Sequence, residues 1–188
     1  MPADTRTPER IRGIQGVYTL AVDSTTGRAY CADWSGETLF EFDRWSLWKK
    51  HPLALPKPAE GAQIACTPDG TLYMSCSGQE NARTGPVVER WILRIDTTSD
   101  RGEIVVQKDR NGCCVMLSCC SAPDGTLWWL LNPDFGMYRV TPNDAGLDLF
   151  AHSLPVDPAA VAADRHGTVF VASPSGIIRM MPPPTDTE

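Results

Sequence analysis

The sequence predicts an all-β fold built from four copies of one small antiparallel sheet. Three observations lead to this prediction: turns and short apolar strands recur along the 188 residues, the strands are rich in β-branched and aromatic residues, and no segment shows the apolar spacing of a helix. With 42% hydrophobic residues, the chain has enough apolar surface for one domain with a packed core.

Each copy begins with an inner strand of small apolar residues that leads into a turn containing glycine. The turn glycines are Gly27, Gly70, Gly125 and Gly167. Glycine suits such turns because it adopts a positive φ at no steric cost. Two of the three intervals are in the low forties, and the middle one is longer because the second copy carries an insertion.

The strands follow from the alternation of apolar and polar residues around these turns. The predicted inner strands are 18–22, 62–66, 113–120 and 159–163. Second strands follow the turn at 71–75, 126–130 and 168–172, and third strands lie at 39–43, 92–96, 137–141 and 177–181. More polar outer strands follow in three copies, at 46–55, 102–109 and 146–154.

Four short antiparallel strands in roughly 40–50 residues are typical of a β-propeller blade. We therefore predict one domain over residues 1–188, a small β-propeller whose four blades cover approximately 14–56, 61–109, 112–154 and 158–182. The fourth copy ends after its third strand at a run of prolines, and an N-terminal strand at 9–14 is predicted to close the last blade. The alternative is an open half-propeller that is completed by dimerisation.

At the level of single blades the sequence resembles known propeller repeats. The segments "PDGTLYMSCSG" with "ILRID", and "PDGTLWWL" with "MYRVT", look like NHL-type, gluconolactonase-like and streptogramin-lyase-like repeats. The resemblance covers residues 14–182 approximately. It implies blade architecture. For a gluconolactonase-like enzyme it also implies a divalent metal on the channel axis, held by Glu, Asn and Asp, and for a lyase a metal with a general base.

The inner strands do not supply that chemistry. They contain no Glu or Asn and no matched set of carboxylates, whereas a hard cation needs several oxygen ligands. We therefore predict no catalytic residue, no metal ligand and no cofactor, with one divalent metal in the central channel as the alternative. The histidines, His51, His152 and His166, are expected to face solvent.

The stretch "CCVMLSCC" is the most unusual part of the sequence. Strand alternation places Cys113 and Cys119 on one face and Cys114 and Cys120 on the other. Partners six residues apart on a strand lie roughly 20 Å apart, too far to share a zinc ion or a disulfide. These cysteines are therefore expected to be small core residues, with thiol sensing as the alternative.

The predicted binding surface is the propeller face that carries the loops between second and third strands. The insertion in the second copy gives this face its longest loop, and long loops on a rigid scaffold are often functional. Exposed aromatic residues at the hairpin tips are suitable anchors for a protein partner. The predicted binding residues are Asp33, Trp34, Gln79, Glu80, Asn81, Arg83, Asp134 and Phe135.

Charge limits the kind of partner. The net charge of −6 and the pI of about 5.0 argue against nucleic acid and anionic membranes and favour a basic protein. No apolar run is long enough to span a membrane, and the polar N-terminus lacks the apolar core of a signal peptide, so a cytoplasmic location is expected. The predicted function is non-catalytic protein binding, for example as an inhibitor or immunity-type protein. The alternative is a metal-dependent lactonase- or lyase-like enzyme.

Overall fold

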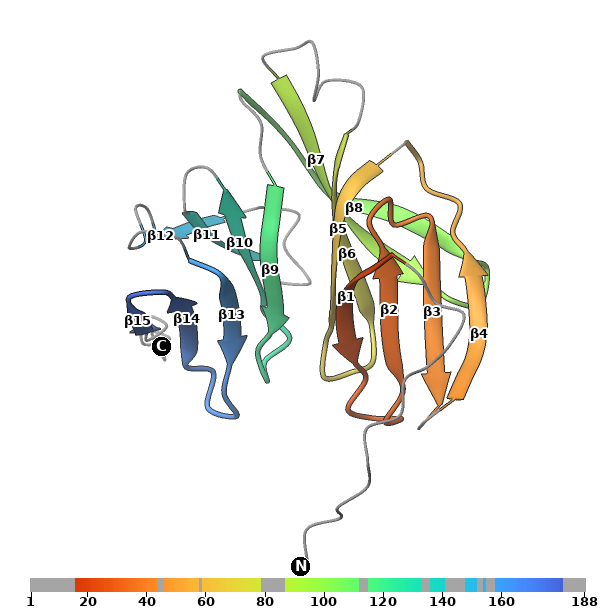
Figure 1. The fold of residues 1–188 in the computed structure, drawn as a ribbon, viewed down its shortest axis with the longest axis horizontal. Helices are drawn as coiled ribbons and strands as arrows, with labels where there is room; N and C mark the ends of the chain where they lie inside the picture. The colour runs from red at the N-terminus through yellow and green to blue at the C-terminus, as the bar shows by residue number, and fades with distance from the viewer. Residues whose placement is uncertain are drawn as a thin grey trace, which may run out of the picture.

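The structure is a computed structural model, and all regular secondary structure in the residues that it describes is β-strand (Figure 1). It describes residues 16–43, 46–57, 59–78, 87–111, 115–132, 136–140, 148–151, 154 and 158–180. All structural statements below concern these residues.

Four antiparallel sheets follow one another along the chain. Blade 1 contains β1 (Val17–Val22), β2 (Ala29–Asp33), β3 (Thr38–Asp43) and β4 (Ser46–Pro52). Blade 2 contains β5 (Ala59–Cys66), β6 (Leu72–Gly78), β7 (Val87–Asp96) and β8 (Arg101–Asn111). Blade 3 contains β9 (Val115–Ser121), β10 (Leu127–Asn132), β11 (Gly136–Val140) and β12 (Asp148–Ala151). Blade 4 contains β13 (Ala160–Ala163), β14 (Val169–Ser173) and β15 (Gly176–Met180).

This arrangement confirms the predicted all-β propeller architecture, and its open form corresponds to the predicted alternative, an open half-propeller. The inner strands contact one another in the order β1, β5, β9, β13, and the four sheets form an arc that does not close into a ring (Figure 1). Blade 4 has three strands among the described residues, as its sequence predicts. The predicted closing strand at 9–14 lies outside the described residues.

The turns between the inner and second strands set the register of the repeat. Three of them are closed by equivalent backbone bonds, from Thr67 N to Thr71 O, from Ala122 N to Thr126 O and from Asp164 N to Thr168 O. The first turn, from Asp23 N to Arg28 O, contains one more residue. All four predicted turn glycines have a positive φ, between 72° and 84°.

Counting from these bonds gives equivalent positions in the four blades. An aromatic residue occupies one position of the second strand in every blade: Tyr30, Tyr73, Trp128 and Phe170. Each blade has two faces, and we call the face toward the next blade in the chain its forward face and the other its rear face. Tyr30, Tyr73 and Trp128 lie on the forward faces. Strand alternation places Phe170 on the forward face of blade 4, because its neighbours Val169 and Val171 point to the rear.

Three apolar cores join successive blades. Ile64 and Met74 of blade 2 pack with Ala32 and Leu39 of blade 1. The adjacent Trp128 and Trp129 point to opposite sides, as the period of a strand requires. Trp129 packs in the core between blades 2 and 3, and Trp128 in the core between blades 3 and 4. One tryptophan therefore fills each of the two spaces on either side of blade 3.

The insertion in the second copy differs in part from the predicted loop. Residues 87–90 belong to β7 and pair with the end of β8, in the register Val87↔Asn111 and Arg90↔Lys108. This two-stranded ribbon extends beyond the rest of blade 2 (Figure 1). The sequence did not predict this part of the strand, because the insertion is mostly polar and contains glycine and proline. In residues 87–90 only Val87 and Val88 are β-branched. Residues 79–86 lie outside the described residues.

Candidate functional site

Two of the eight predicted binding residues lie in the described chain. Asp33 ends β2 and Trp34 begins the hairpin that leads to β3. The other six lie outside the described residues: Gln79, Glu80, Asn81, Arg83, Asp134 and Phe135. The candidate site is therefore built around the first hairpin.

Hydrogen bonds fix this hairpin against its own strand and against blade 2. The Asp33 carboxylate accepts hydrogen bonds from the Ser35 hydroxyl at 3.0 Å and the Thr38 backbone N at 3.3 Å. The backbone O of Trp34 accepts a hydrogen bond from Ala62 N of β5 at 3.1 Å. Because both ends of the turn are held, Trp34 is presented by a rigid scaffold.

Gly36 allows the hairpin to lie this close to blade 2. Its φ is +71°, which favours glycine. A Cβ at this position would come within 2.7 Å of the Met74 sulfur and 3.2 Å of the Ala62 Cβ. A larger residue would therefore push the hairpin away from the neighbouring blade.

The side chain of Trp34 forms an exposed aromatic pair with Tyr18 of β1. The ring centroids are 4.4 Å apart and the planes meet at 80°, an edge-to-face contact. The exposed fraction is 38% for Trp34 and 53% for Tyr18. Sequence analysis missed Tyr18 because it begins an inner strand, where side chains of the other blades are packed between sheets.

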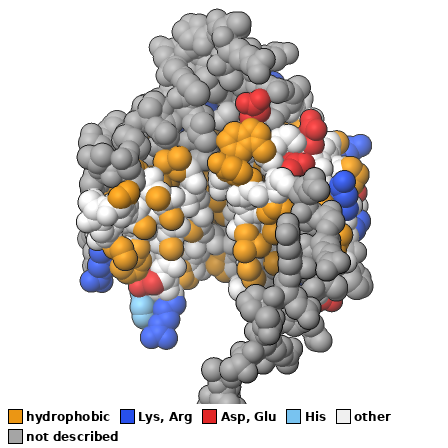
Figure 2. Space-filling view, viewed as in Figure 1, with side chains coloured by type: hydrophobic (Ala, Val, Ile, Leu, Met, Phe, Trp, Pro, Cys, Tyr) orange, Lys and Arg blue, Asp and Glu red, His pale blue; other side chains and the backbone are white. Residues whose placement is uncertain are grey.

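Acidic residues border the aromatic pair. Asp33 and Glu37 flank the hairpin tip, and Glu60 of β5 lies two residues before Ala62, which bonds to Trp34. Figure 2 shows hydrophobic side chains gathered at the upper end of the described surface with acidic side chains beside them. We call this surface, defined by Tyr18, Asp33, Trp34, Glu37 and Glu60, the aromatic–acidic patch.

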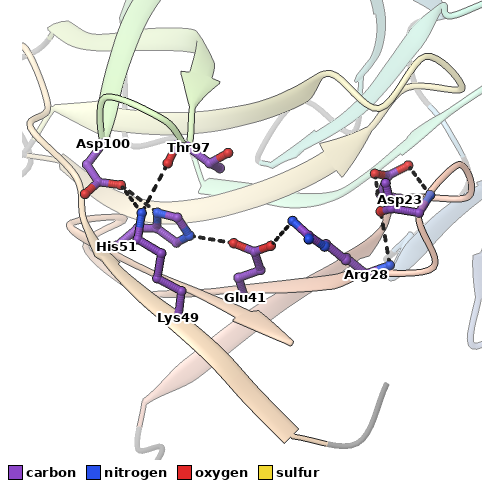
Figure 3. A network of polar contacts seen from close by, with 8 residues as sticks. Asp23, Arg28, Glu41, Lys49, His51, Thr97 and Asp100 are labelled. Carbon is purple, nitrogen blue, oxygen red and sulfur yellow. Dashed lines mark hydrogen bonds and ion pairs between the residues drawn. The ribbon is translucent and has the colours of Figure 1, made fainter. Parts of the chain in front are cut away.

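A second polar cluster lies between blades 1 and 2, centred on His51 (Figure 3). His51 Nε2 is 2.8 Å from Glu41 Oε2, and His51 Nδ1 is 2.6 Å from Asp100 Oδ1. Arg28 forms an ion pair with the other oxygen of Glu41 at 2.6 Å. Each ring nitrogen of His51 therefore lies at hydrogen-bonding distance from a carboxylate oxygen.

The expectation that all three histidines face solvent is therefore wrong for His51, which is 1% exposed. Its buried position follows from the pairing of β4 with β3 and from the turn that brings Asp100 across from blade 2. His166 is exposed as expected, and His152 lies outside the described residues. The hydrogen bond from His51 lowers the pKa of the Asp100 carboxyl. Because the cluster is closed by its own members, we assign it a structural role.

The described cysteines are free thiols in apolar surroundings. As predicted, Cys119 and Cys120 lie on opposite faces of β9, in the cores toward blades 2 and 4 respectively. Burial raises the pKa of the Cys76 and Cys120 thiols to about 12, and that of Cys66 to about 11. Such thiols carry almost no thiolate at neutral pH, and the thiolate is the reactive form. Cys113 and Cys114 lie outside the described residues.

Within the described ranges, no group of three or more His, Cys, Asp or Glu side chains has a geometry that could hold a metal ion. A cavity of about 520 Å³ lies at the outer strands of blade 2 and is lined in part by Arg94, Asp96 and Glu103. Arg94 pairs with Glu103, and Asp96 accepts hydrogen bonds from Thr98 and Ser99. Because these groups are satisfied within the chain, we place no ligand there.

The fold defines the chain as a β-propeller, and solved structures agree. No protein-family model matches the sequence, and a search of curated proteins gives no match. Similar structures include YCF48 bound to D1 peptide (15% identity, 92% of this chain and 52% of that chain, TM-score 0.61). A gluconolactonase from Xanthomonas campestris is 14% identical over 86% of this chain and 57% of that chain, with a TM-score of 0.57. The WD40 β-propeller domain of Doa1 is 11% identical over 87% of this chain and 49% of that chain, with a TM-score of 0.53.

These likenesses confirm the predicted resemblance to gluconolactonase-like propeller repeats at the level of the blade. The chain spans about half the length of the structures that it matches. In the part of the chain that the structure describes, no helix is long and apolar enough to cross a membrane.

Proposed function

We propose that this chain is a non-catalytic, protein-binding β-propeller that holds a basic segment of a partner protein on its aromatic–acidic patch. The exposed pair of Tyr18 and Trp34 carries the proposal. A tryptophan and a tyrosine that stay exposed at a fixed position provide large contact area at low entropic cost, and such residues dominate many protein interfaces.

The charge around the pair supports a basic partner. Asp33 and Glu37 belong to the hairpin that carries Trp34, and Glu60 lies two residues before Ala62, which bonds to Trp34. The whole chain carries a net charge of −6. Complementary charge speeds the encounter and sets orientation, while the aromatic residues supply most of the affinity. One similar structure, YCF48, is bound to a peptide, and we take this as an example of a similar fold that binds a protein segment.

Within this proposal, a specific instance is a cytoplasmic inhibitor or immunity-type protein that covers a basic surface of a toxin or enzyme. The alternative is a lactonase- or lyase-like enzyme with one divalent metal in the central channel. Metal analysis of the purified protein separates the two. A stoichiometric divalent metal whose removal abolishes a hydrolase activity would favour the enzyme.

Peptide selection tests the proposal directly. Displayed peptides of mixed charge are selected on the wild-type protein, and we expect the retained peptides to be basic and to contain an apolar residue. Their binding should weaken with added salt and fall at least about tenfold in Trp34→Ala, the loss typical of an interface anchor. Pro123→Asp, which changes an exposed turn residue of blade 3, serves as the control. Peptides without charge preference, or equal binding by Trp34→Ala, would reject the proposal.

A further inference from the structure

The inner strand of blade 1 exposes apolar residues whose equivalents in the other blades are buried or partly buried. Leu20 is equivalent to Ile64 and Val161, counted from the turn bonds. Leu20 is 62% exposed, whereas Ile64 is 2% and Val161 is 6% exposed. Val22 on the same rear face is also exposed, while its equivalent Cys66 is buried. Farther out on this face, Phe40 and Phe42 of β3 are already buried.

Blade 4 shows the same difference on its forward face. Ile177 is 75% exposed, although its equivalents Leu39, Ile92 and Met137 are almost completely buried in the cores between blades. Phe170 occupies the aromatic position of the second strand but is only partly buried. Each end of the arc therefore carries an apolar half of the interface that joins blades within the chain.

The two unpaired faces look in the same direction. In Figure 1 the sheet β1–β4 spreads to the right of the inner strands and the sheet β13–β15 spreads to the left, each with one face toward the viewer. Figure 2, in the same view, shows hydrophobic side chains over both sheets. Two faces arranged in this way correspond to the two cut faces of a half ring.

We infer that two copies of this chain pair through these faces, blade 4 of each copy against blade 1 of the other, to form one ring of eight blades. The contact between the two copies has the same arrangement as the contact between neighbouring blades within one chain. A half turn about the channel axis relates the copies and generates two identical joints, so the assembly closes after two chains. Twice four sheets is within the usual range of about 4–8 blades.

The internal joints predict the contact at the new joint. Thr19 accepts a hydrogen bond from Ile64 N at 3.1 Å, and Ser118 accepts one from Val161 N at 3.2 Å. The equivalent of Thr19 and Ser118 in blade 4 is Ala160, which is exposed, and the equivalent of Ile64 and Val161 in blade 1 is Leu20. Ala160 of one copy should therefore lie against the backbone of Leu20 in the other.

A second copy is the occupant that the observations favour, because both halves of the interface are present on the same chain. In the pair, the forward face of blade 4 in each copy covers the rear face of blade 1 in the other copy. The extent of the arc fits as well, since this chain covers 49%, 52% and 57% of the length of the three similar structures. Tyr18 of the aromatic–acidic patch also lies on the rear side of β1, so the two proposals share this side of blade 1. They are tested separately, because pairing is measured with variants of Leu20 and Ile177 and partner binding with a variant of Trp34.

Molar mass in solution, measured by light scattering after size exclusion, tests the pairing. The wild-type chain should have twice the mass of the 20.6 kDa monomer. Leu20→Asp and Ile177→Asp each place a charge in both joints, so each should give a monomer. Neither change should affect folding, because both side chains are exposed in the single chain. Pro123→Asp adds the same charge away from both faces and should remain a dimer.

Mixing the two variants identifies which faces meet. In a mixed pair, one joint contains neither substitution and the other contains both, so an equimolar mixture should recover dimer that neither variant forms alone. If blade 1 instead met blade 1, each joint of a mixed pair would carry one substitution, and no recovery would follow. A monomeric wild-type chain, or a dimer that persists in both variants, would overturn the inference and leave these faces to residues 1–15 or to another protein.

Discussion

Replacing His51 with alanine is expected to lower the free energy of unfolding by about 3–5 kcal/mol, the usual cost of removing one partner from a buried ionic cluster. His51 and Glu41 are 1% and 3% exposed. Without the imidazole, Glu41 keeps its pair with Arg28 but loses a hydrogen bond in a site that water does not reach. Urea denaturation followed by circular dichroism measures the change.

His166→Ala is the matched control, because His166 lies exposed on a turn and its substitution should change stability by less than about 0.5 kcal/mol. The cluster also predicts a dependence on pH. The pKa of Asp100 is lowered in the folded state, so the unfolded chain binds its proton first as the pH falls below about 4. The stability from Asp100 is therefore present above that pH and is lost in acid. Equal effects of the two histidine substitutions would show that the cluster does not support the fold.

Replacing Trp129 with alanine is expected to lower the free energy of unfolding by about 3–5 kcal/mol, because a large core side chain is lost and a cavity remains. Trp129 is fully buried in the core that joins blades 2 and 3, where it packs with Tyr73, Ile92 and Leu127. Thermal denaturation should show a fall in Tm of roughly 10 °C for a chain of this size.

Trp34→Ala removes the same side chain from an exposed position and should cost less than about 1 kcal/mol. The comparison separates a tryptophan that holds the blades together from one that is available to a partner. It also establishes that the Trp34 variant is folded, which its use in peptide binding requires. A loss of stability in Trp34→Ala as large as in Trp129→Ala would remove Trp34 from the candidate site.

The blades were predictable from the sequence because their signals are local. A turn glycine, a β-branched strand and an alternating third strand recur in each copy, and each needs only neighbouring residues to form. The opposite directions of Trp128 and Trp129 follow from the period of a strand. The same reasoning placed "CCVMLSCC" in an inner strand, and the described part of it, β9, occupies that position.

Features that depend on distant residues were not predictable in this way. His51 is buried because it meets Glu41 and Asp100, which are 10 and 49 residues away in the sequence. Tyr18 joins the candidate site because, among the described residues, no other blade packs on the rear side of β1. Both outcomes follow from how blades meet in space, which the pattern of a single blade does not contain.

Hydrogen exchange of the protein with and without a selected basic peptide tests the central claim, that a partner binds the aromatic–acidic patch. Bound peptide should slow amide exchange in residues 33–38 and at the start of β1. It should leave the turns at 67–71, 122–126 and 164–168 unchanged, since these lie at the opposite ends of the inner strands. Slower exchange confined to those turns, with the first hairpin unaffected, would contradict the account.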